Sequence, residues 1–399
     1  MTDKLFQKDS YLFSFTATVV EITKRVEGYG IILNRTAFYP ESGGQLADKG
    51  TLDGIPVEDV QKEGEESIIH FCHSWNVKEG DSIKGVVDSE FRLGNMRRHT
   101  GQHILSGSFL NIADARTVSA HLGAVESTIE IDTDKLTDEQ IRLIEADANR
   151  IIMRNDPIEI GFVEKAKLSE LKVRKIPDRE GVFRIVKIGE HDNTACGGTH
   201  CHVTGEVGMV KIISKEKIRE HYRFTFLAGL DALEDYRLKN DITGKLSVLL
   251  TCHYTDLPET VEKLNNNNIK SRREIGRLNR ELQPYEAEKL RENAREYGNT
   301  KVISGHYHDY NPKAMKNLAL YLGEFDNSLN ILVDNDRMII SVAENVSIKA
   351  GDLAKLFISE FGGKGGGNKT LAQIGRIPTE ELKNNIMKFI DMIGDKLDG

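Results

Sequence analysis

Two short segments of the sequence carry side chains that could bind one metal ion. His99 and His103 are four residues apart, a spacing that places both imidazoles on one face of a helix. Cys196 and His200 have the same spacing, and the two glycines between them let the backbone turn sharply. One thiolate and three imidazoles form a soft donor set that suits zinc better than magnesium, calcium or manganese, which prefer oxygen. The sequence therefore predicts a zinc site made of these four side chains.

The residues next to these segments limit the chemistry of the site. Cys201 and His202 adjoin the second segment, and we expect them in a strand or at the surface rather than on the ion. Thr100 stands where the metalloprotease pattern has a glutamate, and no general base is evident beside the histidines, so peptidase activity is not expected. A closed four-ligand site would be structural, whereas catalysis needs an open position. The sequence leaves open whether the zinc site is structural or catalytic.

The same segments carry a family resemblance. Arg98–His103 together with Ala195–His200 resembles the editing domain of alanyl-tRNA synthetase. Three further segments agree with that family: the Gly-Gly-Gln signature within Phe38–Gln45, followed by Asp48 and Gly50, then Thr204–Gly208, and the glycine-rich Gly362–Gly367 of the synthetase's C-terminal domain. The resemblance thus covers nearly the whole chain, but the several hundred residues that activate the amino acid have no counterpart here. The chain is therefore similar to freestanding alanyl-tRNA editing proteins of the long AlaX type.

This resemblance implies a function in translation fidelity. It implies an ATP-independent, zinc-dependent aminoacyl-tRNA deacylase that removes serine, with glycine as a further candidate, wrongly esterified to tRNA(Ala). It assigns His99, His103, Cys196 and His200 to the metal. It assigns Gln45 to the loop that contacts the ester or the water, where an amide can orient a water but cannot act as a base.

Serine differs from alanine by one hydroxyl group, so discrimination requires a buried hydrogen-bond partner. The segment Thr117–Gly123 and the neighbouring Ser127 and Thr128 supply such groups, and similar segments line the pocket in the family. We expect Thr128 and His121 to contribute. Two other functions remain open: a non-catalytic tRNA-binding module with a structural zinc, and a metallohydrolase of small esters. The sequence also leaves open whether zinc activates the water or only positions the substrate.

Composition limits how the chain could bind RNA. The net charge is −8, so binding must depend on local basic residues rather than on a global positive field. The residues expected to contact tRNA are Arg97, Arg98, Lys211, Lys215, Lys217, Arg223 and, in the glycine run, Lys364. That run is not a phosphate-binding loop, because Asn368 follows the last glycine where the loop has its lysine. No ATPase is expected.

The remaining pattern indicates an α+β chain of several domains that positions these residues. A chain of 399 residues exceeds what one hydrophobic core normally supports. Short strands broken by glycine indicate a small antiparallel β-barrel, followed by mixed helices and strands, a helical segment, and helices alternating with strands. We expect four domains: a barrel over residues 1–91, a zinc-containing α+β editing domain over 92–238, a long coiled-coil-like helical linker over 239–298, and a glycine-rich α/β domain over 299–399.

Location and assembly follow from apolar patterning. No apolar run is long enough for a membrane helix, charges occupy the N-terminus where a signal peptide is apolar, and four cysteines are too few for a disulfide framework. A cytoplasmic protein is expected.

From Leu257 to Tyr285 apolar residues recur at three-four spacing, interrupted by Asn268 and Ser271, which predicts a homodimer through this helix and the C-terminal domain. Pro284 is expected to kink or end the helix.

Overall fold

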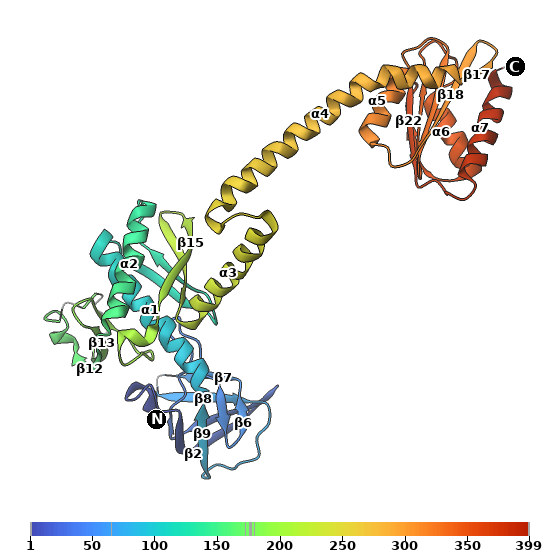
Figure 1. Cartoon of the computed structure of the whole chain (residues 1–399). Helices are drawn as coiled ribbons and strands as arrows, with labels where there is room; N and C mark the ends of the chain where they lie inside the picture. The colour runs from blue at the N-terminus through green and yellow to red at the C-terminus, as the bar shows by residue number, and fades with distance from the viewer. Residues whose placement is uncertain (1, 65, 172, 175–177, 179, 398–399) are drawn as a thin grey trace. The chain divides into compact units, whose positions relative to one another are not determined.

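The computed structural model describes residues 2–64, 66–171, 173–174, 178 and 180–397. The chain forms two compact units, Met1–Lys245 and Leu246–Gly399. Each has its own strands and helices (Figure 1), in agreement with the predicted α+β class. Among the described residues, no helix combines the length and apolar character needed to cross a membrane.

The N-terminal part of the first unit is a seven-stranded antiparallel sheet, which corresponds to the predicted barrel. Its strand order is β6-β5-β9-β2-β3-β8-β7. The long strand β2 joins the two halves, because it pairs with β9 through its first residues and with β3 through its last ones. The strands are β2 (Ser14–Arg25), β3 (Gly28–Leu33), β5 (Gly50–Leu52), β6 (Ile55–Val57), β7 (Asp59–Glu63), β8 (Ser67–Cys72) and β9 (Ser82–Val87). Two short segments, β1 (Asp3–Lys4) and β4 (Arg35–Thr36), pair in parallel beside it.

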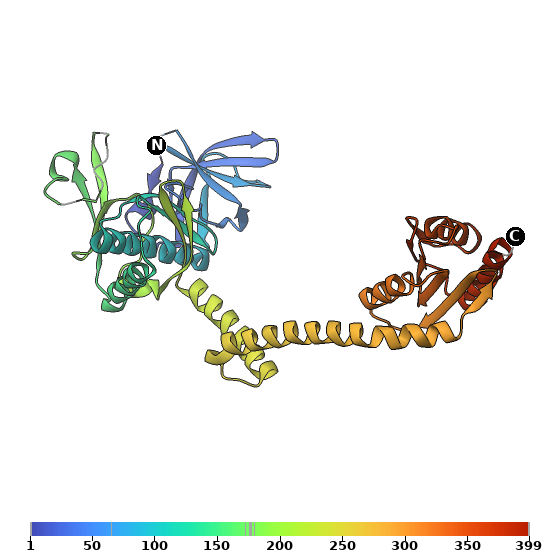
Figure 2. The same ribbon diagram turned by 90° about the horizontal axis from the view of Figure 1, so that it is seen from above.

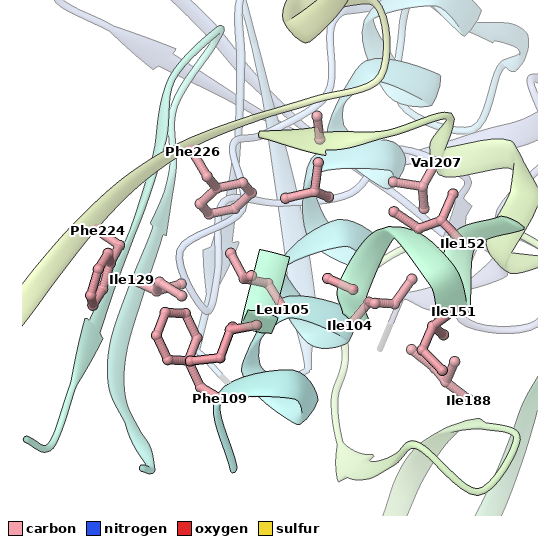
Figure 3. Close-up of a cluster of buried hydrophobic side chains, with 14 of the residues drawn as sticks. Ile104, Leu105, Phe109, Ile129, Ile151, Ile152, Ile188, Val207, Phe224 and Phe226 are labelled. Atoms are coloured by element: carbon pink, nitrogen blue, oxygen red, sulfur yellow. The ribbon is translucent and has the colours of Figure 1, made fainter. Parts of the chain in front are cut away.

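The rest of the first unit surrounds helix α1 (Ser89–Ala113), which is capped by Asp88. Its middle portion is buried on every side, because a four-stranded sheet and helix α2 (Asp138–Arg154) both pack against it. Figure 3 shows this core, where the ring of Phe109 lies against that of Phe224, and Phe226 of the same sheet belongs to the same cluster. The sheet has the order β10-β11-β16-β15, from β10 (Thr117–Leu122), β11 (Ser127–Ile131), β15 (Val210–Ile218) and β16 (His221–Ala228). A separate antiparallel sheet contains β12 (Ile158–Glu164), β13 (Val182–Ile188) and β14 (Asp192–Ala195).

Two helices follow the four-stranded sheet. Helix α3 (Leu230–Leu250) runs past residue 238, where we expected a domain boundary. Helix α4 (Leu257–Glu292) does not end at Pro284 but runs through it, because a proline removes only a single backbone hydrogen bond. Figure 2 shows α4, yellow to orange, as one continuous helix.

The C-terminal unit contains a six-stranded mixed sheet in the order β17-β18-β19-β20-β22-β21. Helices alternate with strands as expected, but within this sheet only β18 and β19, which α5 connects, pair in parallel, and the other neighbours are antiparallel. Its elements are β17 (Arg295–Tyr297), β18 (Thr300–Tyr307), α5 (Pro312–Leu322), β19 (Ser328–Asp334), β20 (Arg337–Val342), α6 (Ala350–Phe361), β21 (Lys364–Gly367), β22 (Leu371–Gly375) and α7 (Leu382–Leu397). The glycine run forms the edge strand β21, and a Cβ on Gly351 of α6 would lie 2.7 Å from the carbonyl oxygen of Gly367. Glycine therefore permits close helix–strand approach here.

Candidate metal centre

Four side chains far apart in the sequence meet in the first unit. The candidate ligand atoms of His99, His103, Cys196 and His200 all lie within 4.8 Å of one another. The Sγ atom of Cys196 is 3.4 Å from Nε2 of His99 and 3.3 Å from Nε2 of His200. Zinc–nitrogen bonds of about 2.05 Å and a zinc–sulfur bond of about 2.3 Å put tetrahedral N and S ligands roughly 3.5 Å apart. The group therefore fits one tetrahedral ion.

The second nitrogen of each imidazole faces an oxygen. Nδ1 of His99 is 2.7 Å from Oε1 of Gln45, and Nδ1 of His103 is 3.2 Å from Oδ2 of Asp192. Nδ1 of His200 is 3.3 Å from Oγ1 of Thr100. Such outer partners fix the ring orientation of metal-bound histidines and leave Nε2 for the ion. The arrangement thus matches a metal centre more closely than a chance cluster of histidines.

The electrostatics of the group agree with this interpretation. Burial would raise the pKa of the Cys196 thiol, but the neighbouring imidazoles of His99, His200 and His103 hold that pKa well below its ordinary value. Burial lowers the pKa of His200 to about 3, which keeps this imidazole neutral. Burial also acts to lower the pKa of His103, but Cys196 and Asp192 outweigh it and raise the value to about 9. Without an ion, a thiolate and an imidazolium therefore stabilise each other, and metal binding must displace the proton on His103.

Gln45 is fully buried beneath the group. Its Oε1 accepts hydrogen bonds from Nδ1 of His99 and from the backbone N–H of Thr199, and its Nε2 donates to Oγ1 of Thr199 at 2.8 Å. Gln45 thereby ties His99 to the loop that carries Cys196. The resemblance assigned Gln45 to contact with the ester or water, whereas the structure places it behind a ligand.

The loop that carries Gln45 is anchored to helix α1 through Asp48. Asp48 accepts from the backbone N–H of Tyr39 and binds the guanidinium of Arg92, in the first turn of α1; both side chains are fully buried. Arg92 also donates to the carbonyl oxygens of Ser10 and Ala37. Arg92, in the first turn of α1, thus holds the loop that carries Gln45 against the helix that supplies His99.

A cavity of about 1110 Å³ opens beside the metal centre. His99, His103 and Cys196 line it, together with Gln102 of α1 and residues 117–120 of β10. His121 is exposed and Thr128, its partner in β11, is partly buried, and neither is among the lining residues. Cys201 is packed in the core, and the imidazole of His202 stacks on Tyr11 instead of joining the ligand group.

Most of the basic residues expected to contact RNA already have acidic partners. Their Nζ or guanidinium nitrogens lie 2.6–3.1 Å from a carboxylate in the pairs Arg98–Asp231, Lys211–Glu145, Lys215–Asp138, Lys217–Asp134 and Arg223–Glu130. Nε of Arg97 donates to the carbonyl oxygen of Glu206, and Lys364 is exposed on β21. Ion pairing lowers the charge that five of these side chains offer to a phosphate.

Sequence reasoning missed several parts of the site. Asp192 was not identified, because it carries no motif and reaches His103 only when β14 lies against α1. Thr100 and Thr199 lie inside the two recognised segments, where they hydrogen-bond to His200 and Gln45. A hydroxyl group placed between two metal ligands was the sequence signal that could have identified them. No motif in the sequence marked Arg174 as part of the site, although its Nε lies 3.3 Å from Oδ1 of Asp192.

Comparisons with known proteins match successive parts of the chain. Residues 7–91 match the family of class II (A) tRNA synthetases, and residues 183–224 match the threonyl and alanyl tRNA synthetase second additional domain. Residues 299–396 match the DHHA1 domain.

Individual relatives extend over nearly the whole chain. The alanyl-tRNA editing protein AlaX-L of Pyrococcus horikoshii is 33% identical over 94% of this chain and 95% of its own length. Alanine–tRNA ligases of Pyrococcus abyssi and Methanospirillum hungatei are 33% and 32% identical, but the chain spans only 44% and 42% of their lengths. Among solved structures, the C-Ala domain from Aquifex aeolicus alanyl-tRNA synthetase matches 27% of this chain and 98% of its own length at 19% identity, with a TM-score of only 0.24. The near-complete match in both directions shows that the chain belongs to the family of the alanyl-tRNA editing protein AlaX-L.

Proposed function

We propose that the chain is a zinc-dependent hydrolase that deacylates mischarged tRNA(Ala) in the cytoplasm, mainly seryl-tRNA(Ala) and secondarily glycyl-tRNA(Ala). The observation that carries the proposal is the group His99, His103, Cys196 and His200, three of which line a cavity of about 1110 Å³. Membership of the editing-protein family supports the substrate class. Ester hydrolysis requires no ATP.

Zinc bound by these four side chains would supply a positive charge that polarises an ester carbonyl or a water. The chain's own residues contribute by position. Gln45 and Asp192 hold the rings of His99 and His103, so Nε2 of each points to the centre. The backbone N–H of Gly198 donates to the Cys196 sulfur at 3.4 Å, which stabilises the thiolate.

Recognition of serine requires an acceptor or donor for its hydroxyl group inside the cavity. Thr117 lines the cavity and donates its proton to Oγ of the buried Ser106 at 2.7 Å. Its oxygen therefore presents lone pairs to a ligand. We assign serine recognition to Thr117, in preference to Thr128 and His121, which do not line the cavity. Thr117→Val should reduce the ratio of serine to alanine release at least ten-fold, because the substrate hydroxyl then loses its partner.

Deacylation assays test the main proposal. Release of serine from seryl-tRNA(Ala) should be rapid, and both chelation and Cys196→Ala should abolish it. Tight tRNA binding without turnover would support a non-catalytic module with a structural zinc. Turnover of small serine esters at a rate equal to that of seryl-tRNA(Ala) would support a general esterase.

The homodimer is a second part of the proposal. Helix α4 exposes Val261, Leu264, Ile275, Leu278 and Leu282, which repeat at coiled-coil spacing. A second copy would cover this apolar row, as the predicted seam requires. Light scattering should give twice the chain mass of 44.8 kDa, and a monomer mass at all concentrations would contradict the dimer.

A further inference from the structure

A row of three side chains crosses the sheet β12–β13–β14 and ends at the metal centre. Phe162 of β12 is opposite Arg184 of β13. Cys196 directly follows β14, next to the Ile185–Ala195 pair, and its backbone N–H donates to the Arg184 carbonyl oxygen at 3.0 Å, which places it beside Arg184. Residues directly opposite each other on neighbouring strands place their side chains on the same face. An exposed aromatic ring, a guanidinium and a metal ligand therefore lie in sequence across one face.

The guanidinium of Arg184 is buried and incompletely satisfied. The residue is 7% exposed; its Nε donates to the carbonyl oxygen of Gln7 at 3.2 Å and its Nη1 donates to that of Cys196 at 2.8 Å. Among the described residues, its Nη2 is buried and has no hydrogen-bond partner. A buried donor without a hydrogen-bond partner is costly, and an anion at Nη2 would relieve that cost.

A hollow of about 270 Å³ lies over this row and meets the metal cavity. Gln7, Ala195, Cys196 and Gly197 line both. The other lining residues of the hollow are Phe162, Val182, Phe183 and Arg184, so it contains an arginine but no carboxylate. Phe162 is 58% exposed, which leaves its ring open to a ligand.

We propose that this surface, the Phe162–Arg184 groove, binds the single-stranded 3′ end of the tRNA, with a phosphate on Arg184 and a base stacked on Phe162. The inference rests on the proposed function, because an aminoacyl ester at the metal centre has a phosphodiester on the 5′ side of its ribose. Arginine matches phosphate geometry through paired N–H groups. Stacking on an aromatic ring tolerates every base.

Binding of a 5′-labelled ACCA tetranucleotide to the full chain tests the groove by fluorescence anisotropy at several salt concentrations. Phe162→Ala should weaken binding about five-fold or more, while the slope of log K against log salt stays unchanged. Phe162→Trp should restore the affinity. Arg184→Gln should reduce the magnitude of that slope by about 0.7, because one phosphate contact on a single strand is lost.

Matched controls separate the groove from general effects. Tyr236→Ala removes an aromatic ring that is 66% exposed on α3, and Arg150→Gln removes an exposed arginine on α2. Both controls should bind like the parent chain. Failure of the parent to bind the tetranucleotide, or parental affinity in Phe162→Ala, overturns the groove, and the Phe162 series decides even if Arg184→Gln does not fold. Because this readout needs no turnover, it fails independently of the deacylase proposal.

Discussion

The two glycines between Cys196 and His200 differ sharply in what surrounds them. A Cβ on Gly198 would lie 2.2 Å from Cε1 and 2.5 Å from Nδ1 of His99, and 2.9 Å from Oε1 of Gln45. A Cβ on Gly197 would have no heavy atom within 4 Å. Because ordinary contacts begin at 3.4 Å, Gly198→Ala must displace the His99 ring by roughly 1 Å, whereas metal–ligand distances tolerate about 0.2 Å.

Gly198→Ala should therefore remove His99 from the metal centre. A four-ligand zinc site has a binding free energy of about 10–16 kcal/mol, so one ligand contributes roughly 2.5–4 kcal/mol. The zinc dissociation constant should rise about 70- to 900-fold in Gly198→Ala and stay within about two-fold of the parent in Gly197→Ala. Competition with a chromophoric chelator measures both. Equal zinc affinity in the two variants, each shown to be folded by circular dichroism, would refute the geometry.

Three further predictions concern the side chains around the site. Asp192→Asn removes the charge that faces Nδ1 of His103 and should weaken zinc binding about 10-fold, measured by the same competition; an unchanged affinity would count against the role of Asp192. Asp48→Ala leaves Arg92 buried without its partner and should lower the free energy of unfolding by about 3–5 kcal/mol in urea, whereas a loss below 1 kcal/mol would contradict the anchor. Burial lowers the pKa of His70 from 6.5 to about 4, so the folded state binds this proton less readily than the unfolded state. This difference contributes about 3 kcal/mol to the free energy of unfolding, a contribution that is present above pH 6.5 and is lost as the pH falls toward 4. The pH dependence of the free energy of unfolding in urea should therefore differ between the parent and His70→Gln in this window.

The metal group was accessible from sequence because its ligands come in two pairs with helical or turn spacing. His99 and His103 share one helix and Cys196 and His200 share one loop, so each pair is a local pattern. Local patterns of this kind depend on backbone geometry alone.

Long-range partners were not accessible in the same way. Asp192 contacts His103 across 89 positions, and Gln45 contacts Thr199 across 154. The ion pair of Lys217 with Asp134 likewise joins separate elements, so a basic residue that looks free in sequence has an acidic partner in the fold. The structure contradicts only one of the two outcomes predicted at Pro284, since α4 does not end there but continues to Glu292. A proline removes a single backbone hydrogen bond, so the rest of the helix can form around it.

The zinc content of the purified chain is the most direct test of the central claim that four side chains form one metal centre. Elemental analysis after dialysis should give one zinc ion per parent chain. The same measurement on Cys196→Ser should show most of the zinc lost, because an alcohol oxygen replaces the thiolate. Zinc absent from the parent, or retained in full by Cys196→Ser, would contradict the account.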